Sequence, residues 1–299
     1  MPELPEVQTV VSDLNKKIIG KKITGIWFDA PKIIKKSAPK NFSALIKGAV
    51  IKEVKRRGKN ILIYLQKSQR LNVKGQKLLL LIHQKMTGHL LIGKWKIENK
   101  KIRPLKPAAL KEKVNDYIHF IFKLDDGRML GLSDLRKFAK VLCGSVEEIK
   151  ALPELLKIGP EPLAADFNFG QFQKIISKEK RKIKQVLLDQ EVIAGIGNIY
   201  SDDILWQARI HPFKPADKLS GYELKNIYKA MKMILNKAVN LRGTSISDFR
   251  DTAGKAGGYG NIRLVYRREN EPCKRCQAPI KRVKIGGRSA RFCSFCQKL

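Results

Sequence analysis

The sequence predicts an α+β protein of two domains, an N-terminal β-sandwich followed by a helical domain that ends in a four-cysteine β-hairpin. Three observations predict this fold class. Strand-like patterns fill the first half of the chain, an amphipathic helix pattern appears in the second half, and four of the 5 cysteines lie close together near the C-terminus. We expect the sandwich at residues 1–145, a linker at 146–158, the helical domain at 159–262 and the cysteine module at 263–299.

Three patterns indicate strands in the N-terminal domain. Ile61, Ile63 and Leu65 alternate with residues of the opposite face, which is typical of a half-buried strand. The aliphatic run at 78–82 predicts a strand buried on both faces. Residues 117–124 and 128–132 flank Asp-Asp-Gly, which predicts a β-hairpin because glycine adopts the positive φ of such turns without strain. So many strands in one region favour a sandwich or barrel.

The second half contains the pattern of a long amphipathic helix. Its apolar residues recur at helical spacing, at Leu224, Ile227, Tyr228, Met231, Ile234, Leu235 and Ala238. The opposite face carries Lys225, Lys229 and Lys232, which we interpret as solvated. Proline and glycine within 153–162 mark the linker, and the glycine-rich stretch 254–260 predicts a mobile loop.

The charge of the chain points to an anionic partner. Lys and Arg number 61 against 27 Asp and Glu, a formal net charge of +34. Nucleic acid is the leading candidate because Lys and Arg neutralise phosphates, and an anionic membrane surface is the rival. The longest aliphatic run, 78–82, is too short to span a bilayer, and the acidic N-terminus does not match a signal peptide. We therefore expect a soluble, cytoplasmic nucleic-acid binder in a reducing compartment.

The clustered cysteines predict a metal site. Cys273 and Cys276 form one C-x2-C pair, and Cys293 and Cys296 form a second. Two such pairs at this distance are typical of one structural Zn²⁺ ion, and four thiolates leave no open position for catalysis. The alternative is four unrelated thiols. The lone Cys143 is expected to be a small buried apolar residue.

A glycine-containing turn suggests a phosphate site. Gly195-Ile196-Gly197-Asn198 follows a helical segment at 183–188 and precedes another. We expect Asn198 to cap the second helix, whose N-terminal N–H groups could bind phosphate. An ordinary turn between helices is the alternative, although the basic residues of 180–184 favour phosphate.

The N-terminal residues carry groups that could take part in catalysis. Removal of Met1 would expose the secondary amine of Pro2, which can attack an aldehyde-level carbon and form an iminium. Glu3 lies beside it and could move protons. The alternative is a frayed, solvated terminus.

Several motifs, taken in order along the whole chain, resemble the formamidopyrimidine-DNA glycosylase family. They are Pro2-Glu3-Leu4-Pro5-Glu6-Val7, Lys59 within Arg-Arg-Gly-Lys-Asn, His83-x-x-Met86-Thr87-Gly88, Asp134-x-Arg136-Lys137-Phe138, Gly159-Pro160-Glu161-Pro162-Leu163, Leu187-Leu188-Asp189-Gln190, Ala194-Gly195-Ile196-Gly197-Asn198-Ile199-Tyr200 and the cysteine segment. With Leu4, the chain resembles those family members that act on oxidised purines, since the enzymes that act on pyrimidines usually carry glycine at this position.

The resemblance implies a role for each matching residue. Pro2 would form the Schiff base at C1′ of the damaged nucleotide, and Glu3 would protonate the sugar ring oxygen. Lys59 would donate a proton tied to β-elimination, although the residues alone also fit a solvated lysine. Arg288 would bind the phosphates beside the lesion and is linked to δ-elimination.

The remaining implied residues contact DNA. Lys184 and Asn198 would hold phosphates from a helix–two-turn–helix, and the space of the flipped base would be filled by Met86, Arg136 and Phe138. Met86 and Phe138 could instead be core residues. Asn115 stands where the family has a histidine that contacts DNA, and we expect Asn115 to contact DNA as well. The chain also departs from the family pattern at Ala139, Asp203 and Ala290. These positions affect the local DNA contacts that the resemblance implies.

The resemblance therefore implies a bifunctional glycosylase and AP lyase of base excision repair. It would excise 8-oxoguanine and formamidopyrimidines from double-stranded DNA and cleave the strand at abasic sites. We expect the protein to be a monomer without a membrane partner. Two alternatives stay open: a glycosylase for oxidised pyrimidines, and a non-catalytic protein that binds damaged DNA.

Overall fold

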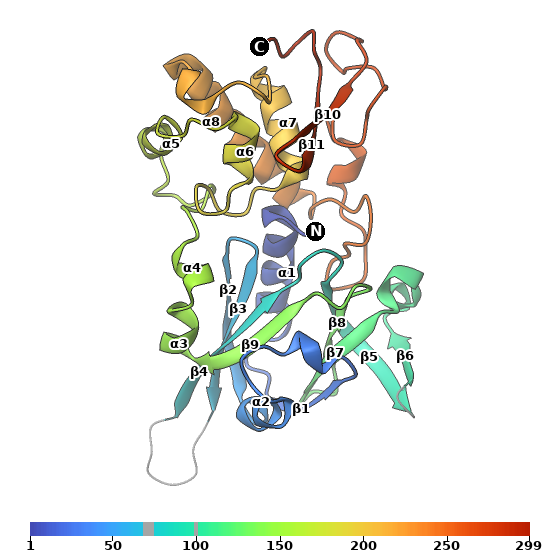
Figure 1. Cartoon of the computed structure of the whole chain (residues 1–299). Coiled ribbons are helices and arrows are strands. Elements are labelled where there is room, and N and C mark those ends of the chain that lie inside the picture. The colour runs from blue at the N-terminus through green and yellow to red at the C-terminus, as the bar shows by residue number, and fades with distance from the viewer. Residues whose placement is uncertain (68–74, 99–100) are drawn as a thin grey trace. The chain divides into compact units, whose positions relative to one another are not determined.

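The computed structural model in Figure 1 describes residues 1–67, 75–98 and 101–299. The chain divides into two compact units, which are described separately. The first unit comprises Met1–Leu156 and Arg242–Gly258, and the second comprises Lys157–Leu241 and Tyr259–Leu299. The segment 242–258 thus belongs to the N-terminal unit, whereas the sequence suggested continuous domains.

Two antiparallel sheets form the first unit and confirm the predicted β-sandwich. One sheet has the order β2 (Val50–Arg57), β3 (Asn60–Lys67), β4 (Gln76–His83) and β9 (Lys140–Ser145). The other has the order β1 (Ile23–Phe28), β7 (Ile118–Leu124), β8 (Met129–Ser133), β5 (His89–Glu98) and β6 (Lys101–Lys106). The expected hairpin at 125–127 joins β7 and β8. Ile61, Leu62 and Ile63 are all buried, so β3 is covered on both faces rather than one.

A helix that the sequence analysis missed begins the first unit. Helix α1 (Leu4–Lys17) starts with a capping box, in which Glu3 and Glu6 each accept a hydrogen bond from the other's backbone N–H. Its apolar face, made of Leu4, Val7, Val10, Val11 and Leu14, is 4% exposed or less. Each fully buried Leu or Val of this kind stabilises the fold by about 1.5–3 kcal/mol. The N-terminus is therefore an anchored element and not a frayed end.

Short helices complete the first unit. They are η1 (Pro31–Ile33), α2 (Pro39–Ile46), η2 (Ala108–Lys111), η3 (Lys113–Asn115), α3 (Val146–Lys150) and α4 (Pro153–Leu156). The stretch expected to be a linker, 146–158, thus contains α3 and α4. Cys143 packs against the sandwich core as an apolar residue, but it is partly and not fully buried, in contrast to the expectation.

Helices dominate the second unit: α5 (Phe169–Ile176), α6 (Ile183–Leu188), α7 (Asn198–Ala208), η4 (Ala216–Lys218), α8 (Gly221–Asn240) and η5 (Tyr259–Asn261). Helix α8 confirms the predicted amphipathic helix. Lys225 and Lys229 are exposed as expected, but Lys232 is half-buried and donates to the carbonyl oxygen of Ala164 at 3.2 Å. Within the described ranges, no helix is both long and apolar enough to cross a membrane.

The C-terminal hairpin consists of β10 (Lys281–Ile285) and β11 (Arg288–Phe292). Gly286 and Gly287 form its two-residue turn with φ of +52° and +74°, a conformation that strongly favours glycine. The glycine-rich stretch 254–260 is more regular than expected. Gly258 pairs with Thr244, and Tyr259, which begins η5, is 1% exposed.

Candidate active site and DNA interface

The N-terminal segment of the first unit is held by the carboxylate of Glu6. The Glu3 N–H donates to Glu6 Oε2 at 2.7 Å, and the Thr244 N–H donates to Glu6 Oε1 at 2.7 Å. Gly243 has a φ of +78°, and a Cβ at this position would lie 2.7 Å from Glu6 Oε1. Glycine is therefore required for this close approach. This role of Glu6 was not predicted from the sequence, although the spacing of Glu6 from Glu3 is that of a capping box.

Burial is the main influence on the N-terminal amine. In the full chain the amine belongs to Met1, and burial lowers its pKa below the ordinary value of 8.0. Lys59 lowers this pKa further. Three carboxylates oppose the shift, those of Glu3, Glu6 and Asp248. Burial outweighs these three carboxylates, so the pKa of the Met1 amine is lowered on balance.

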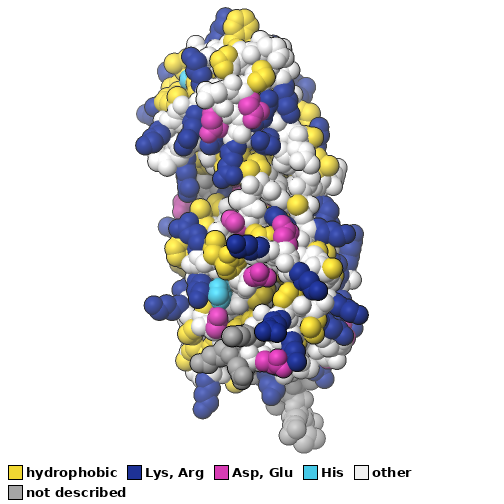
Figure 2. Space-filling model, turned by 90° about the vertical axis from the view of Figure 1, so that its right-hand side faces the viewer, with side chains coloured by type: hydrophobic (Ala, Val, Ile, Leu, Met, Phe, Trp, Pro, Cys, Tyr) yellow, Lys and Arg dark blue, Asp and Glu magenta, His cyan; other side chains and the backbone are white. Residues whose placement is uncertain are grey.

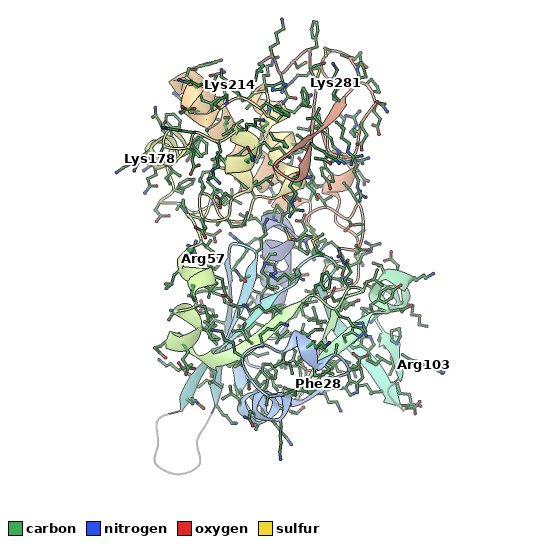
Figure 3. All side chains as sticks on the ribbon, in the orientation of Figure 1. Phe28, Arg57, Arg103, Lys178, Lys214 and Lys281 are labelled. Atoms are coloured by element: carbon green, nitrogen blue, oxygen red, sulfur yellow. The ribbon has the colours of Figure 1, made fainter. Side chains whose placement is uncertain are left out.

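Lys59 belongs to the same site and is 7% exposed, so it is not a solvated lysine. It lies in the β2–β3 turn between Gly58, with a φ of +56°, and Asn60. Figure 3 labels Arg57, which ends β2 just before this turn. Asn60 pairs with His83 across β3 and β4, which brings the motif histidine near the turn.

His83 is kept neutral by its surroundings. Its Nδ1 accepts the Lys85 N–H at 2.9 Å. Burial is the main cause that lowers the pKa of His83 to about 3, and the positive charges of Lys85, Lys59 and Lys140 add to it. His83 is thus a neutral side chain in the field of three lysines, one of which is Lys59.

Met86 and Phe138 lie at the surface and are not core residues. Met86 is 37% exposed and Phe138 is 52% exposed. The guanidinium of Arg136 stacks over the Phe138 ring at 4.5 Å from its centroid. Apolar side chains exposed together with an arginine are well suited to replace an extruded base.

Thr87 and Asp134 connect the two loops that carry these residues. Thr87 Oγ1 donates to Asp134 Oδ1 and accepts the Arg136 N–H at 3.2 Å. Asp134 Oδ2 accepts the Ala139 N–H at 2.7 Å. Asp134 is fully buried, so its hydrogen bonds fix the backbone of both loops while Met86 and Phe138 remain exposed.

The side chain of Asn115 is directed into the protein. It is 1% exposed, its Oδ1 lies 2.9 Å from His89 Nε2, and its Nδ2 donates to the Ala109 carbonyl at 2.9 Å. The expectation that this residue contacts DNA is not supported by this position, because both ends of the amide are already hydrogen-bonded.

In the second unit, Asn198 lies at the predicted turn but one position further into the helix than expected. Gly197 is the N-cap of α7 and Asn198 is its first helical residue. Gln190 fixes the turn by donating to the Ile196 carbonyl at 2.7 Å and accepting the Gly195 N–H at 2.9 Å. Asn198 Oδ1 is buried without a hydrogen-bond partner among the described residues.

Lys184 is also interior. It is fully buried, forms an ion pair with Asp202 and donates to Ser201 Oγ at 3.1 Å. Burial raises the pKa of Asp202 to about 6, against the opposing attraction of Lys184. Lys184 therefore ties α6 to α7, and this burial argues against a direct phosphate contact.

Arg288 begins β11 at the tip of the C-terminal hairpin and is exposed. A Cβ at the neighbouring Gly286 would lie 2.5 Å from Gln185 Nε2 of α6. The tip thus packs closely against the helical part of its own unit. The other departures from the family pattern, Ala139, Asp203 and Ala290, are 1% exposed or less. They affect the interior rather than a DNA-facing surface.

The four clustered cysteines fit a zinc ion. All four Sγ atoms lie within 4.8 Å of one another, and three pairs are separated by 4.0, 3.4 and 3.4 Å. A tetrahedral site with Zn–S bonds of about 2.3 Å requires sulfur separations of about 3.8 Å. Trp206 Nε1 donates to Cys273 Sγ at 3.3 Å, and Arg275 stacks on the Trp206 ring. This ligand set holds one structural Zn²⁺ ion.

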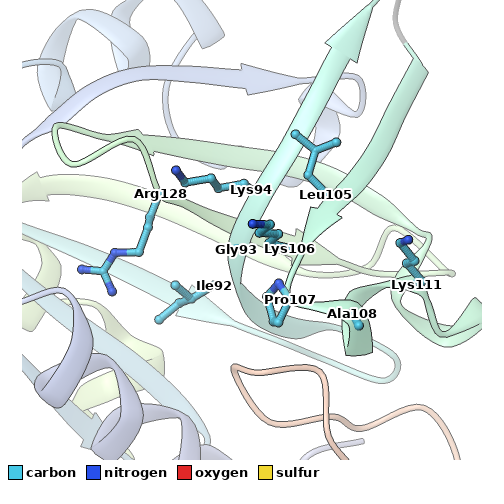
Figure 4. A pocket seen from close by; sticks show the side chains of 9 residues that line it. All are labelled: Ile92, Gly93, Lys94, Leu105, Lys106, Pro107, Ala108, Lys111 and Arg128. Carbon is cyan, nitrogen blue, oxygen red and sulfur yellow. The ribbon is translucent and has the colours of Figure 1, made fainter.

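The first unit also has a cavity of about 630 Å³ along β5 and β6 (Figure 4). Its apolar wall includes Ile92, Leu105 and Pro107, and lysines stand around it. None of the residues expected to act on DNA lines it. Lys and Arg are spread over the face shown in Figure 2 rather than gathered in a single patch.

Three family models match the chain. The formamidopyrimidine-DNA glycosylase N-terminal domain matches residues 1–141, the formamidopyrimidine-DNA glycosylase H2TH domain matches 158–250, and the zinc finger found in FPG and IleRS matches 270–299. The chain belongs to the formamidopyrimidine-DNA glycosylase family. The matches cover most of both units, including the cysteine module, and the helical domain is a helix–two-turn–helix.

Similar proteins agree with this family over the whole length. The formamidopyrimidine-DNA glycosylase of Heliobacterium modesticaldum is 36% identical, with 100% of each chain covered. The structure of Lactococcus lactis Fpg with abasic-site DNA has a TM-score of 0.84 at 32% identity, covering 99% of this chain and 100% of that one. A structure of MutM with DNA containing carbocyclic 8-oxo-G has a TM-score of 0.83 at 33% identity, with 100% of each covered.

Proposed function

We infer that this chain is a DNA glycosylase and AP lyase of base excision repair that removes oxidised purines such as 8-oxoguanine and formamidopyrimidines. Membership of the family over the full length supports the activity, as do relatives bound to 8-oxo-G and abasic-site DNA. The single observation that carries the mechanism is the anchored N-terminal segment, in which Pro2 is buried and the Glu3 N–H donates to Glu6 Oε2 at 2.7 Å. A fixed chain end can hold an amine in position as a nucleophile.

We propose that Pro2 begins the reaction after Met1 has been removed. Its amine attacks C1′ of the damaged nucleotide, the glycosidic bond breaks, and the electron pair leaves with the base. Glu3 protonates the ring oxygen, so that the sugar opens and an iminium links Pro2 to C1′. Lys59 supplies the proton transfer tied to β-elimination, and Arg288 promotes δ-elimination by binding the flanking phosphates.

DNA is held by side chains of both units. Met86, Arg136 and Phe138 fill the space of the extruded base, which lowers the cost of flipping. Asn198 contacts a phosphate at the start of α7, where helix N–H groups are available. Lys184 acts on this contact through Ser201 and Asp202, which belong to the same helix. The zinc ion stabilises the hairpin that carries Arg288 and takes no part in the chemistry.

Excision assays on duplexes that differ only in the damaged base distinguish the three candidate functions. We expect release of 8-oxoguanine together with a borohydride-trapped adduct. Preferential release of thymine glycol would instead assign the chain to oxidised pyrimidines. Tight binding without release of either base would assign a non-catalytic damage-binding role. An N-terminally extended chain is the matched control, since its charge and DNA-binding surface are retained.

The assembly and location are proposed on the same basis. We propose a monomer that works in the bacterial cytoplasm on nucleoid DNA, because the similar proteins are bacterial and the substrate is chromosomal. Sedimentation with and without duplex tests the monomer, and imaging of the tagged C-terminus tests the location.

A further inference from the structure

We propose that Arg242 is a positioning residue for the N-terminal nucleophile, an inference that rests on the proposed function. It acts through a cluster that we call the Arg242 clip, defined as Arg242, Asp13, Asp251 and Thr252. The clip fastens the segment 242–258 to α1 within the first unit, and this segment in turn holds Glu6.

Arg242 bridges two carboxylates from distant parts of the sequence. Its Nη2 donates to Asp13 Oδ2 at 2.6 Å and to Asp251 Oδ2 at 2.8 Å, and its Nε donates to Asp251 Oδ2 at 3.0 Å. The Asp13 and Asp251 side chains are only 8% and 6% exposed, whereas that of Arg242 is 44% exposed. Because two nearly buried carboxylates share one guanidinium, its removal would leave them to repel each other.

Thr252 extends the clip. Its Oγ1 donates to Asp13 Oδ2 at 2.7 Å and accepts from Lys17 Nζ at 2.8 Å, while its carbonyl accepts the Ile92 N–H at 2.7 Å. The pKa of Asp13 is lowered because the hydrogen bonds from Arg242 and Thr252 outweigh its burial. Asp13 is therefore a permanent anion near neutral pH, and the clip is held by charge.

The clip reaches the active site through two residues. Gly243 and Thr244 directly follow Arg242; Gly243 packs on Glu6, and the Thr244 N–H donates to Glu6 Oε1. The other oxygen of Glu6 accepts the Glu3 N–H, one residue from Pro2. A shift of the segment at Arg242 would thus be transmitted to the backbone that carries the nucleophile.

The test replaces Arg242 by Gln, with Arg242→Lys as the conservative variant. Lys237→Gln removes one positive charge from the exposed surface of α8 and is the matched control. We expect Arg242→Gln to lower single-turnover excision of 8-oxoguanine by about ten- to a hundredfold, since small misplacements of reacting groups have effects of this size. Duplex affinity should change less than twofold, Arg242→Lys should recover part of the rate, and Lys237→Gln should match the wild type.

A second readout is independent of activity. Hydrogen exchange at the Thr244 and Glu3 amides should be slow in the wild type and faster in Arg242→Gln, with exchange in β3 and β4 unchanged. A double-mutant cycle adds Asp13→Asn, and the double variant should lose no more than the worse single variant. Unchanged exchange at Thr244 in Arg242→Gln overturns the inference, as does a wild-type excision rate. Absence of excision in the wild type would instead overturn the proposed function, while the exchange result would still decide the clip.

Discussion

The Thr244 N–H donates to Glu6 Oε1 at 2.7 Å although the two residues are 238 positions apart in the sequence. The same carboxylate accepts the Glu3 N–H with its other oxygen. The N-terminus is therefore held in place by a segment that directly follows α8 in the sequence. A flexible end would lose conformational entropy at every encounter with DNA, and this anchoring removes that cost in advance.

Replacement of Glu6 by Gln tests this anchoring. The amide keeps one acceptor but turns an NH2 group toward the second backbone N–H, so one buried hydrogen bond is lost. We expect the free energy of unfolding to fall by about 1–3 kcal/mol and excision to slow more than DNA binding weakens. Thermal unfolding and single-turnover kinetics measure the two effects. Wild-type values of both would mean that the Glu6 carboxylate does not hold the terminus.

Replacement of Lys59 by Ala tests whether base release and Schiff-base formation depend on different residues. With Lys59→Ala, release of 8-oxoguanine should slow strongly, whereas an abasic-site duplex should still give some trapped adduct because Pro2 remains the nucleophile. The two substrates are compared in borohydride trapping at equal enzyme concentration. If trapping on the abasic duplex disappears completely while the fold and DNA affinity are intact, Lys59 itself must be reconsidered as the nucleophile.

His83 makes stability depend on pH. Its pKa is lowered from 6.5 to about 3 in the folded state, so in this window the unfolded state binds a proton that the folded state does not. Stability should therefore fall as the pH drops through this window, by up to about 1.4 kcal/mol for each pH unit. His83→Asn cannot bind the proton and should show a shallower loss of stability. Denaturant unfolding between pH 7 and about pH 4 measures the slopes; equal slopes would contradict the assignment.

Zinc removal should unfold the hairpin without unfolding the sandwich. A structural site contributes its binding free energy to local folding, and Cys276 supplies one of the four ligands. We expect Cys276→Ser, or chelation of the metal, to abolish duplex binding while the exchange protection of β3 and β4 persists. A metal-free protein that binds duplex with unchanged affinity would contradict the structural role.

Arg288 should contribute to the salt dependence of DNA binding. The slope of log K against log salt becomes shallower by about 0.9 for each DNA phosphate that the protein no longer neutralises. Arg288→Ala should therefore weaken binding to all sequences and flatten this slope by the amount expected for about one phosphate, while the hairpin keeps its fold. Titrations at several salt concentrations measure it, and an unchanged slope would remove Arg288 from the phosphate-binding residues.

The sequence predicted elements with strong local patterns and missed what depends on tertiary contacts. The β7–β8 hairpin, α8 and the zinc ligands follow from turn chemistry, periodicity and spacing. Helix α1 was overlooked because its capping residue is Glu3 rather than Ser, Thr, Asp or Asn. The burial of Lys184 and Asn115 could not be foreseen, since their partners Asp202 and His89 come together only in the folded chain. The packing of 242–258 within the first unit could not be predicted either, because it depends on a contact between Arg242 and Asp13, which are far apart in the sequence.

The attachment point of the trapped DNA tests the central claim most directly. The 8-oxoguanine duplex is trapped with borohydride, the complex is digested, and mass spectrometry locates the DNA remnant. We expect the remnant on the peptide that begins at Pro2, and no adduct from a chain that retains Met1 or carries an N-terminal tag, with duplex affinity largely unchanged. A remnant that maps to Lys59, or an adduct from the extended chain, would contradict the N-terminal mechanism.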